Sequence, residues 1–259
     1  MKKKKQRPQG FGEMKRGAGS PTSAKTGKST KEAEITYGAL VEEARICWMS
    51  GRTQEVISLL REAIAVNPKH PQAYYNLGNV LRGGDLQAAI AYYRKAIAMD
   101  PNHPEVYVNL GNALREQDDL QGAIDAYRQA LTIKPTIQGL HFHLGNTLME
   151  QGDLQGAIGT YRQALAIKPN HPEACYVLGI ALEGSGDLQG AIGAYRQALA
   201  IKPNYPKANI SLSTVRLLLG DYEDGWDLYE WRFRREKGSI QPHAHPQVER
   251  WDGHNLASG

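Results

Sequence analysis

The sequence lacks long apolar runs. No stretch of about eighteen or more apolar residues occurs in its 259 residues, so a transmembrane helix is not predicted. The basic start, MKKKKQRPQG, is not followed by an apolar segment either. A secretory signal needs such a segment, so secretion by that route is not expected.

Cysteine is also scarce. The two residues, Cys47 and Cys175, lie far apart in helical patterns. Two distant cysteines argue against a disulfide framework and against a cysteine-based metal site. We predict that both are reduced, buried thiols of a cytoplasmic protein.

Positive charge is concentrated at the start of the chain. Residues 1–31 contain ten of the 31 Lys and Arg residues but only one of the 27 acidic residues, Glu13. This segment is rich in Gly, Ser, Thr and Pro, and we predict that it is disordered. Its charge alone could attract nucleic acid or an anionic membrane. Because Phe11 is its only aromatic residue, a solubilising tail is the favoured interpretation, and nucleic acid is not the expected partner.

The remaining chain is repetitive. The dipeptide Leu-Gly recurs, with its leucine at residues 77, 110, 144 and 178, at intervals of 33 or 34 residues. A longer motif follows each Leu-Gly, and at residues 119–135 it reads DLQGAIDAYRQALTIKP. The copies at residues 153–169 and 187–203 differ from one another at a single position, where one has Thr160 and the other Ala194. A fixed period of this length indicates a repeat architecture.

The period, with Leu-Gly followed by Ala-x-x-x-Tyr, Ala and Pro, resembles the tetratricopeptide repeat (TPR) family. The resemblance implies an all-α, right-handed α-solenoid of about six helix-turn-helix repeats. The predicted organisation is a tail at 1–31, a repeat array at 32–239 and an extended, linker-like segment at 240–259. The repeats are 37–70, 71–103, 104–137, 138–171, 172–205 and a divergent 206–239.

Each residue that recurs at an equivalent position of the repeats has a steric explanation. A glycine in a helix interior is costly, so its recurrence predicts close approach of the paired helix. Alanine and tyrosine four residues apart share one face of the second helix, where tyrosine fills space between repeats. Proline ends the second helix. The glycines are Gly78, Gly111, Gly145 and Gly179, and the tyrosines are Tyr93, Tyr127, Tyr161 and Tyr195.

The family resemblance implies that the first helix of each repeat lines a concave groove. The side chains expected there combine aromatic or apolar surface with amides that both donate and accept hydrogen bonds, which suits a protein or peptide ligand. An alternative is that part of the aromatic column packs between helices. The predicted groove residues are Tyr75, Asn79, Arg82, Val108, Asn112, Arg115, Phe142, Asn146, Met149 and Tyr176.

Other sequence motifs give little support for a nucleotide-binding, metal-binding or catalytic site. Gly27-Lys28-Ser29 resembles the end of a phosphate loop, but Thr22 stands where the first glycine is required. His70, His103 and His171 recur at one turn before proline, and Tyr205 replaces them once. We therefore expect no catalytic, cofactor-binding or metal-binding residues, no cofactor, and a non-catalytic scaffold. An exposed terminal repeat could stack on another copy, so self-association remains open.

The C-terminal segment resembles the junction between repeats and a transferase domain in bacterial TPR/glycosyltransferase-like proteins. The alternative function is therefore a substrate-recruiting part of such a transferase, with its catalytic domain absent from this chain and a separate glycosyltransferase-like domain as a partner. The matching residues are Gly220, Asp221, Tyr222, Gly225, Trp226, Tyr229, Glu230, Trp231 and Arg232, followed by Pro246, Trp251, Asp252, Gly253, Leu256 and Gly259.

Overall fold

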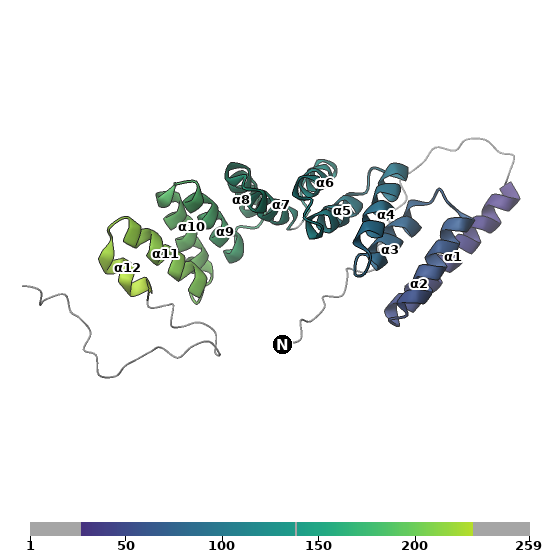
Figure 1. Ribbon diagram of the computed structural model, residues 1–259, viewed down its shortest axis with the longest axis horizontal. Helices are drawn as coiled ribbons and strands as arrows, with labels where there is room; N and C mark the ends of the chain where they lie inside the picture. Colours follow the sequence, from purple (N-terminus) through teal and green to yellow (C-terminus); the bar gives the residue numbers. More distant parts are fainter. Residues whose placement is uncertain (1–26, 138, 230–259) are drawn as a thin grey trace, which may run out of the picture. The chain divides into compact units, whose positions relative to one another are not determined.

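The computed structural model describes residues 27–137 and 139–229, and all regular elements in these ranges are α-helices (Figure 1). The helices are α1 Gly27–Met49, α2 Thr53–Val66, α3 Pro71–Leu81, α4 Leu86–Met99, α5 Pro104–Glu116, α6 Leu120–Ile133, α7 Leu140–Gln151, α8 Leu154–Ile167, α9 Pro172–Gly184, α10 Leu188–Ile201, α11 Pro206–Leu218 and α12 Tyr222–Tyr229.

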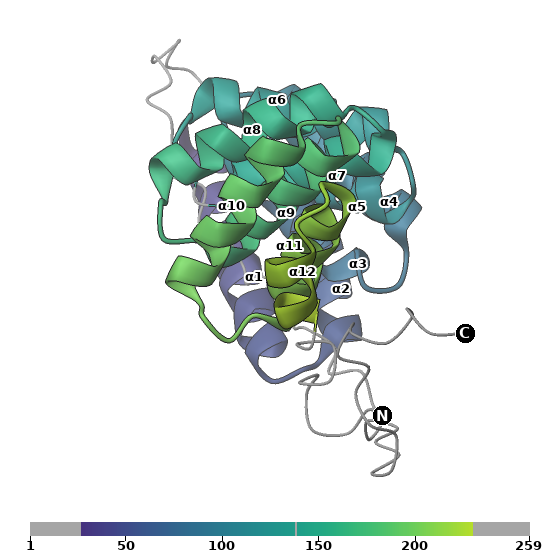
Figure 2. The same cartoon turned by 90° about the vertical axis from the view of Figure 1, so that its left-hand side faces the viewer.

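The chain divides into two compact units, with the boundary between Ile167 and Lys168. The first unit contains α1 to α8, and the second contains α9 to α12. In each unit consecutive helices pack as helix-turn-helix pairs. Within the first unit, α5 and α7 form one layer and α6 and α8 the other (Figures 1 and 2). The predicted all-α repeat fold is confirmed.

Short polar residues and proline set where these helices begin. The carboxylates of Asp85, Asp119 and Asp187 accept hydrogen bonds from the backbone N–H groups of the first turns of α4, α6 and α10. Such N-caps satisfy donors that the helix itself leaves unpaired. Proline is the first residue of α3, α5, α9 and α11, where its missing N–H costs nothing.

The expected close approach of paired helices is present in every regular repeat. A Cβ atom added to Gly78 would lie 2.6 Å from Cε1 of Tyr93, and one added to Gly111 would lie 2.5 Å from Cε1 of Tyr127. Gly145 and Gly179 contact Tyr161 and Tyr195 in the same way. All four tyrosines are buried. In the degenerate first repeat, the same columns are filled by Ala44, Val56 and Leu60, which are fully buried.

Two helix starts differ from the predicted bounds of the tail (1–31) and of the fourth repeat (138–171). Helix α1 begins at Gly27, so the prediction of disorder is wrong for residues 27–31. Residues 28–37 contain neither proline nor glycine, and a helix anchored further along can propagate through such a stretch. Helix α7 begins at Leu140 because the preceding Gly139 has a φ of 77°, and this repeat lacks the proline that starts α3, α5 and α9.

In the second unit, a buried cation ties the last two described helices together. Arg216 near the end of α11 is 8% exposed and forms ion pairs with Asp221, at 2.7 Å, and with Asp224. The predicted sixth repeat is thus described as α11 and α12 up to Tyr229. Residues 1–26 of the predicted tail, residues 230–239 and the segment 240–259 lie outside the described residues.

Candidate functional site

The first helices of the repeats carry hydrogen-bonded asparagines at one recurring position. The hydroxyl of Tyr93 donates to Oδ1 of Asn79 at 2.8 Å. Tyr127 donates to Oδ1 of Asn112 at 2.7 Å, and Tyr161 donates to Oδ1 of Asn146 at 2.8 Å. Each second helix therefore fixes the orientation of an amide on its paired first helix.

Burial keeps these hydroxyls protonated and able to donate. It raises the pKa of Tyr127 to about 12, and it raises the pKa of Tyr93 and of Tyr161 further still. A buried phenolate would lose its hydration without a compensating charge. Near neutral pH the tyrosine is thus the donor, and the asparagine oxygen is the acceptor.

Helices α3 and α5 of the first unit are joined by a buried polar network. Nδ2 of Asn109 donates to the hydroxyl of Tyr75 and to Oδ1 of Asn79, both at 2.9 Å. Tyr75 is only 6% exposed, and its ring centroid lies 6.2 Å from that of Tyr93. Tyr75 and Asn79 therefore pack between helices. For Tyr75 this is the alternative considered in the sequence analysis, that part of the aromatic set packs between helices and does not line the groove.

The other predicted groove residues of α5 and α7 are half-buried, so part of each side chain reaches solvent. These residues are Val108, Asn112, Arg115, Phe142, Asn146 and Met149. The ring of Phe142 packs near Tyr161, with centroids 6.1 Å apart. The Nδ2 groups of Asn112 and Asn146 have no hydrogen-bond partner in the described part of the chain. They are therefore available to an external acceptor.

Charged side chains border this surface. Arg82, which follows the last residue of α3, pairs with Glu116 on α5 at 3.3 Å, and Arg115 pairs with Glu150 on α7 at 3.9 Å. Both pairs are partly exposed, so each contributes at most about 1 kcal/mol to stability. The arginines were predicted as groove residues but the glutamates were not, because each glutamate lies in the repeat after its arginine.

Tyr176 belongs to the second unit and has a comparable environment. It is half-buried on α9, and its ring lies 5.9 Å from Tyr195 and 5.2 Å from Tyr205. Ile180 replaces the asparagine in this repeat, and Tyr195 donates instead to Oε2 of Glu183 at 2.7 Å. The second unit thus lacks the tyrosine–asparagine pair in this repeat.

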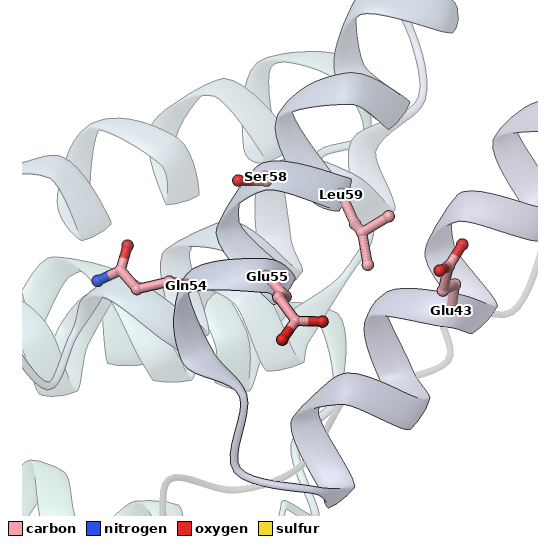
Figure 3. Close-up of a pocket in the computed structure, with 5 residues that line it drawn as sticks. All are labelled: Glu43, Gln54, Glu55, Ser58 and Leu59. Carbon is pink, nitrogen blue, oxygen red and sulfur yellow. The ribbon is translucent and has the colours of Figure 1, made fainter.

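A separate surface depression of about 340 Å³ lies between α1 and α2 (Figure 3). Glu43 of α1 and Gln54, Glu55, Ser58 and Leu59 of α2 line it. Glu55 is already paired with Arg52 at 2.7 Å. None of the predicted groove residues lines this depression.

The histidines and cysteines have structural positions. His70 and His171 accept hydrogen bonds from backbone N–H groups as the N-caps of α3 and α9. Cys47 and Cys175 are buried free thiols, as predicted. Among residues 27–137 and 139–229, no three His, Cys, Asp or Glu side chains are grouped to ligate a metal ion. Within the same ranges, no helix has the length and hydrophobicity to cross a membrane.

Comparisons with known proteins agree with the helical-repeat fold. A family model described as tetratricopeptide repeat matches residues 41–104, 79–136 and 142–206, which together make up more than half of the chain. A search of curated protein sequences found no match.

Several solved structures are similar. YrrB, described as a TPR protein with an unusual peptide-binding site, has a TM-score of 0.61 and 22% identity, with 68% of this chain and 91% of YrrB covered. MamA from Desulfovibrio magneticus RS-1 has a TM-score of 0.59 and 23% identity, covering 65% and 97%. Pseudomonas aeruginosa pilF has a TM-score of 0.60 and 19% identity, covering 80% and 95%. At these identities the likeness concerns the fold.

Proposed function

Because the chain belongs to the tetratricopeptide repeat family, we propose that it is a non-catalytic scaffold that binds a protein or peptide in the concave groove along its first helices. The ligand is an extended or helical segment. Its contact surface in the first unit is made by α5 and α7, between the buried network of Tyr75 and the half-buried Met149.

One observation carries this proposal. Asn112 and Asn146 each use Oδ1 to accept from a buried tyrosine, which leaves Nδ2 without a partner in the described residues. Two fixed donors on neighbouring helices suit the backbone carbonyls of a peptide. Val108 and Phe142 add half-buried apolar surface beside them. Pre-orientation by tyrosine lowers the entropy that a ligand would otherwise have to offset.

The remaining predicted residues have supporting roles. Arg82 and Arg115 would contact acidic or carbonyl groups at the edge of the ligand, because each is only loosely paired with a glutamate. Tyr176 would contact ligand only within the second unit. Tyr75 and Asn79 would act indirectly, by holding α5 against α3.

The test begins with a random peptide library selected on the full chain, followed by calorimetric titration of the selected peptides. The variant Asn112→Ala/Asn146→Ala should weaken binding by about tenfold or more, because each lost hydrogen bond contributes about 0.5–1.5 kcal/mol. Gln129→Ala/Gln163→Ala is the matched control, since these exposed amides lie on the second helices α6 and α8. Equal losses in both variants would contradict the groove assignment.

A second proposal is that the chain recruits substrate for a glycosyltransferase-like domain on a separate chain. It is supported by the exposure of Tyr222 (64%) and Trp226 (56%), which belong to the C-terminal segment that resembles a transferase junction. If it is correct, Tyr222→Ala/Trp226→Ala should abolish binding of such a domain, whereas Asn112→Ala/Asn146→Ala should leave that binding unchanged. Loss of binding in Asn112→Ala/Asn146→Ala with full binding in Tyr222→Ala/Trp226→Ala would exclude this second proposal.

A further inference from the structure

Helix α1 has apolar side chains on two opposite faces. One face packs into the first unit: Tyr37, Ala44 and Cys47 are buried in the core formed with α2 and α3. On the other face Ile35 is 73% exposed, Ile46 is 49% exposed and Met49 is 72% exposed. A surface helix that needs only its own core would show one apolar face.

The exposed side chains form a single line. At 3.6 residues per turn, residues 35, 39, 42, 46 and 49 fall within one narrow stripe, on the opposite side of the helix from Tyr37 and Ala44. We call these residues (Ile35, Ala39, Glu42, Ile46 and Met49) the outer stripe. It points away from the core of the unit, and none of the described helices of the first unit covers it.

Helix α1 is also longer than its partner. It contains 23 residues and α2 contains 14, so the beginning of α1 extends beyond α2 (Figure 1). None of the side chains of residues 32–36 is buried. A helical extension without packing is marginal in water. A second surface laid along the outer stripe would stabilise this extension.

We propose that the outer stripe binds the same stripe of a second copy, with the two α1 helices antiparallel around a twofold axis at Glu42. Ile35 and Met49 both lie seven residues from Glu42, so this axis places Ile35 of each copy against the partner's Met49. Residues seven apart occupy equivalent positions of a heptad, as in the contact line of a coiled coil. A twofold interface is self-complementary and closes at two subunits.

Charges at the centre fit this arrangement. Glu42 and Arg45 form an ion pair at 2.5 Å within α1, so both signs lie where the two copies would cross. Arg45 would therefore approach the partner's Glu42 and offset the repulsion between the two carboxylates.

The exposed apolar side chains of α12 are a poorer occupant of the outer stripe. Tyr222 and Trp226 lie on α12 among Glu223, Asp224 and Asp227, and α12 contains no basic residue. Packing α12 on the outer stripe would bring acidic side chains to Glu42. It would also join unlike surfaces, which produces open chains of molecules rather than a closed pair.

The dimer should be weak. At about 1.5 Å per residue α1 is roughly 35 Å long, so a single helix pair buries an area near the lower limit of specific interfaces. The association constant is then measurable by sedimentation equilibrium of the full chain from about 1 µM to about 200 µM, the range where weak interfaces dissociate.

The variant Ile35→Lys/Met49→Lys should weaken dimerisation by at least about tenfold, since it places two charges in the apolar contact. The matched control is Thr36→Lys/Ser58→Lys, which adds the same charge at exposed positions outside the outer stripe. Circular dichroism establishes that both variants fold. A monomeric wild-type chain throughout the range, open-ended polymers, or equal loss in the control would each overturn the proposal.

Cross-linking tests the register independently. The twofold axis brings position 42 next to its own copy, so Glu42→Cys should form an intermolecular disulfide under mild oxidation, whereas Ile35→Cys should not. The natural thiols, Cys47 and Cys175, are buried and do not compete. Cross-linking of Ile35→Cys as readily as Glu42→Cys would indicate a parallel pair and overturn the proposed arrangement.

Discussion

The hydroxyl of Tyr127 donates a hydrogen bond to Oδ1 of Asn112 at 2.7 Å, across the two helices of one repeat. The same tyrosine ring occupies the space that a side chain at Gly111 would need. One residue therefore determines both the distance between the paired helices and the orientation of an amide in the candidate groove.

Replacing Tyr127 by Phe should lower the free energy of unfolding by about 0.5–1.5 kcal/mol, because the substitution removes one hydrogen bond and keeps the ring. Tyr107→Phe is the control, since Tyr107 is only half-buried and has no hydrogen bond among the described residues. Urea denaturation of both variants measures the difference. Equal stabilities would mean that Asn112 replaces the lost donor with water.

Adding a methyl group at Gly111 should be destabilising. The new Cβ would lie 2.5 Å from Cε1 of Tyr127, and overpacking of this kind costs about 1–3 kcal/mol. Gly159→Ala on α8 is the matched substitution, because nothing lies within 4 Å of its Cβ position. It should raise stability by up to about 1 kcal/mol through helix propensity alone. Thermal unfolding of the two variants should thus shift in opposite directions.

Asn76→Val should stabilise the first unit. The Asn76 side chain is fully buried, and neither amide atom has a hydrogen-bond partner in the described part of the chain. Removing such a group recovers a desolvation penalty of about 1–3 kcal/mol. Val177 already occupies this position in its own repeat. Asn109→Val, in contrast, should destabilise, because it breaks the bonds to Tyr75 and Asn79. Chemical denaturation that showed both variants to be destabilised would point to a water bound at Asn76.

Stability should fall at alkaline pH. Burial raises the pKa of Tyr127 from 10.0 to about 12, so the folded state holds this proton more tightly than the unfolded chain does. The corresponding stabilisation is complete below pH 10 and is lost as the pH rises toward 12, by about 2 kcal/mol for this residue. Urea unfolding between pH 8 and pH 11.5 measures the slope, and Tyr127→Phe should reduce it. An unchanged slope would assign the effect to other groups.

The sequence predicted those features that depend on sterics within one repeat. Gly111 and Tyr127 recur with the period, and their contact follows from the lack of a side chain at glycine. The hydrogen bond from Tyr127 to Asn112 was not predicted, because it joins positions on different helices that no local pattern connects.

Features that depend on neighbouring repeats were harder to predict. Tyr75 and Phe142 occupy equivalent positions, yet Tyr75 is buried, with its hydroxyl bonded to Asn109 of the following repeat, whereas Phe142 is half-buried. The late start of α7 had a visible signal in Gln138 and Gly139, which stand where two other repeats have Pro104-Glu105 and Pro172-Glu173. The extension of α1 to Gly27 had no signal in the sequence, since residues 27–31 contain no apolar residue to suggest a packed helix.

Each glycine and the tyrosine that it contacts belong to the same repeat. A segment of 34 residues copied in tandem would bring both members of the pair with it, and no compensating change would be needed elsewhere. Residues 153–169 and 187–203, which differ at one position, have the form expected of such a recent duplication. The number of repeats, and with it the length of the proposed ligand surface, can therefore change in evolution by unequal recombination while the structure of each repeat stays the same.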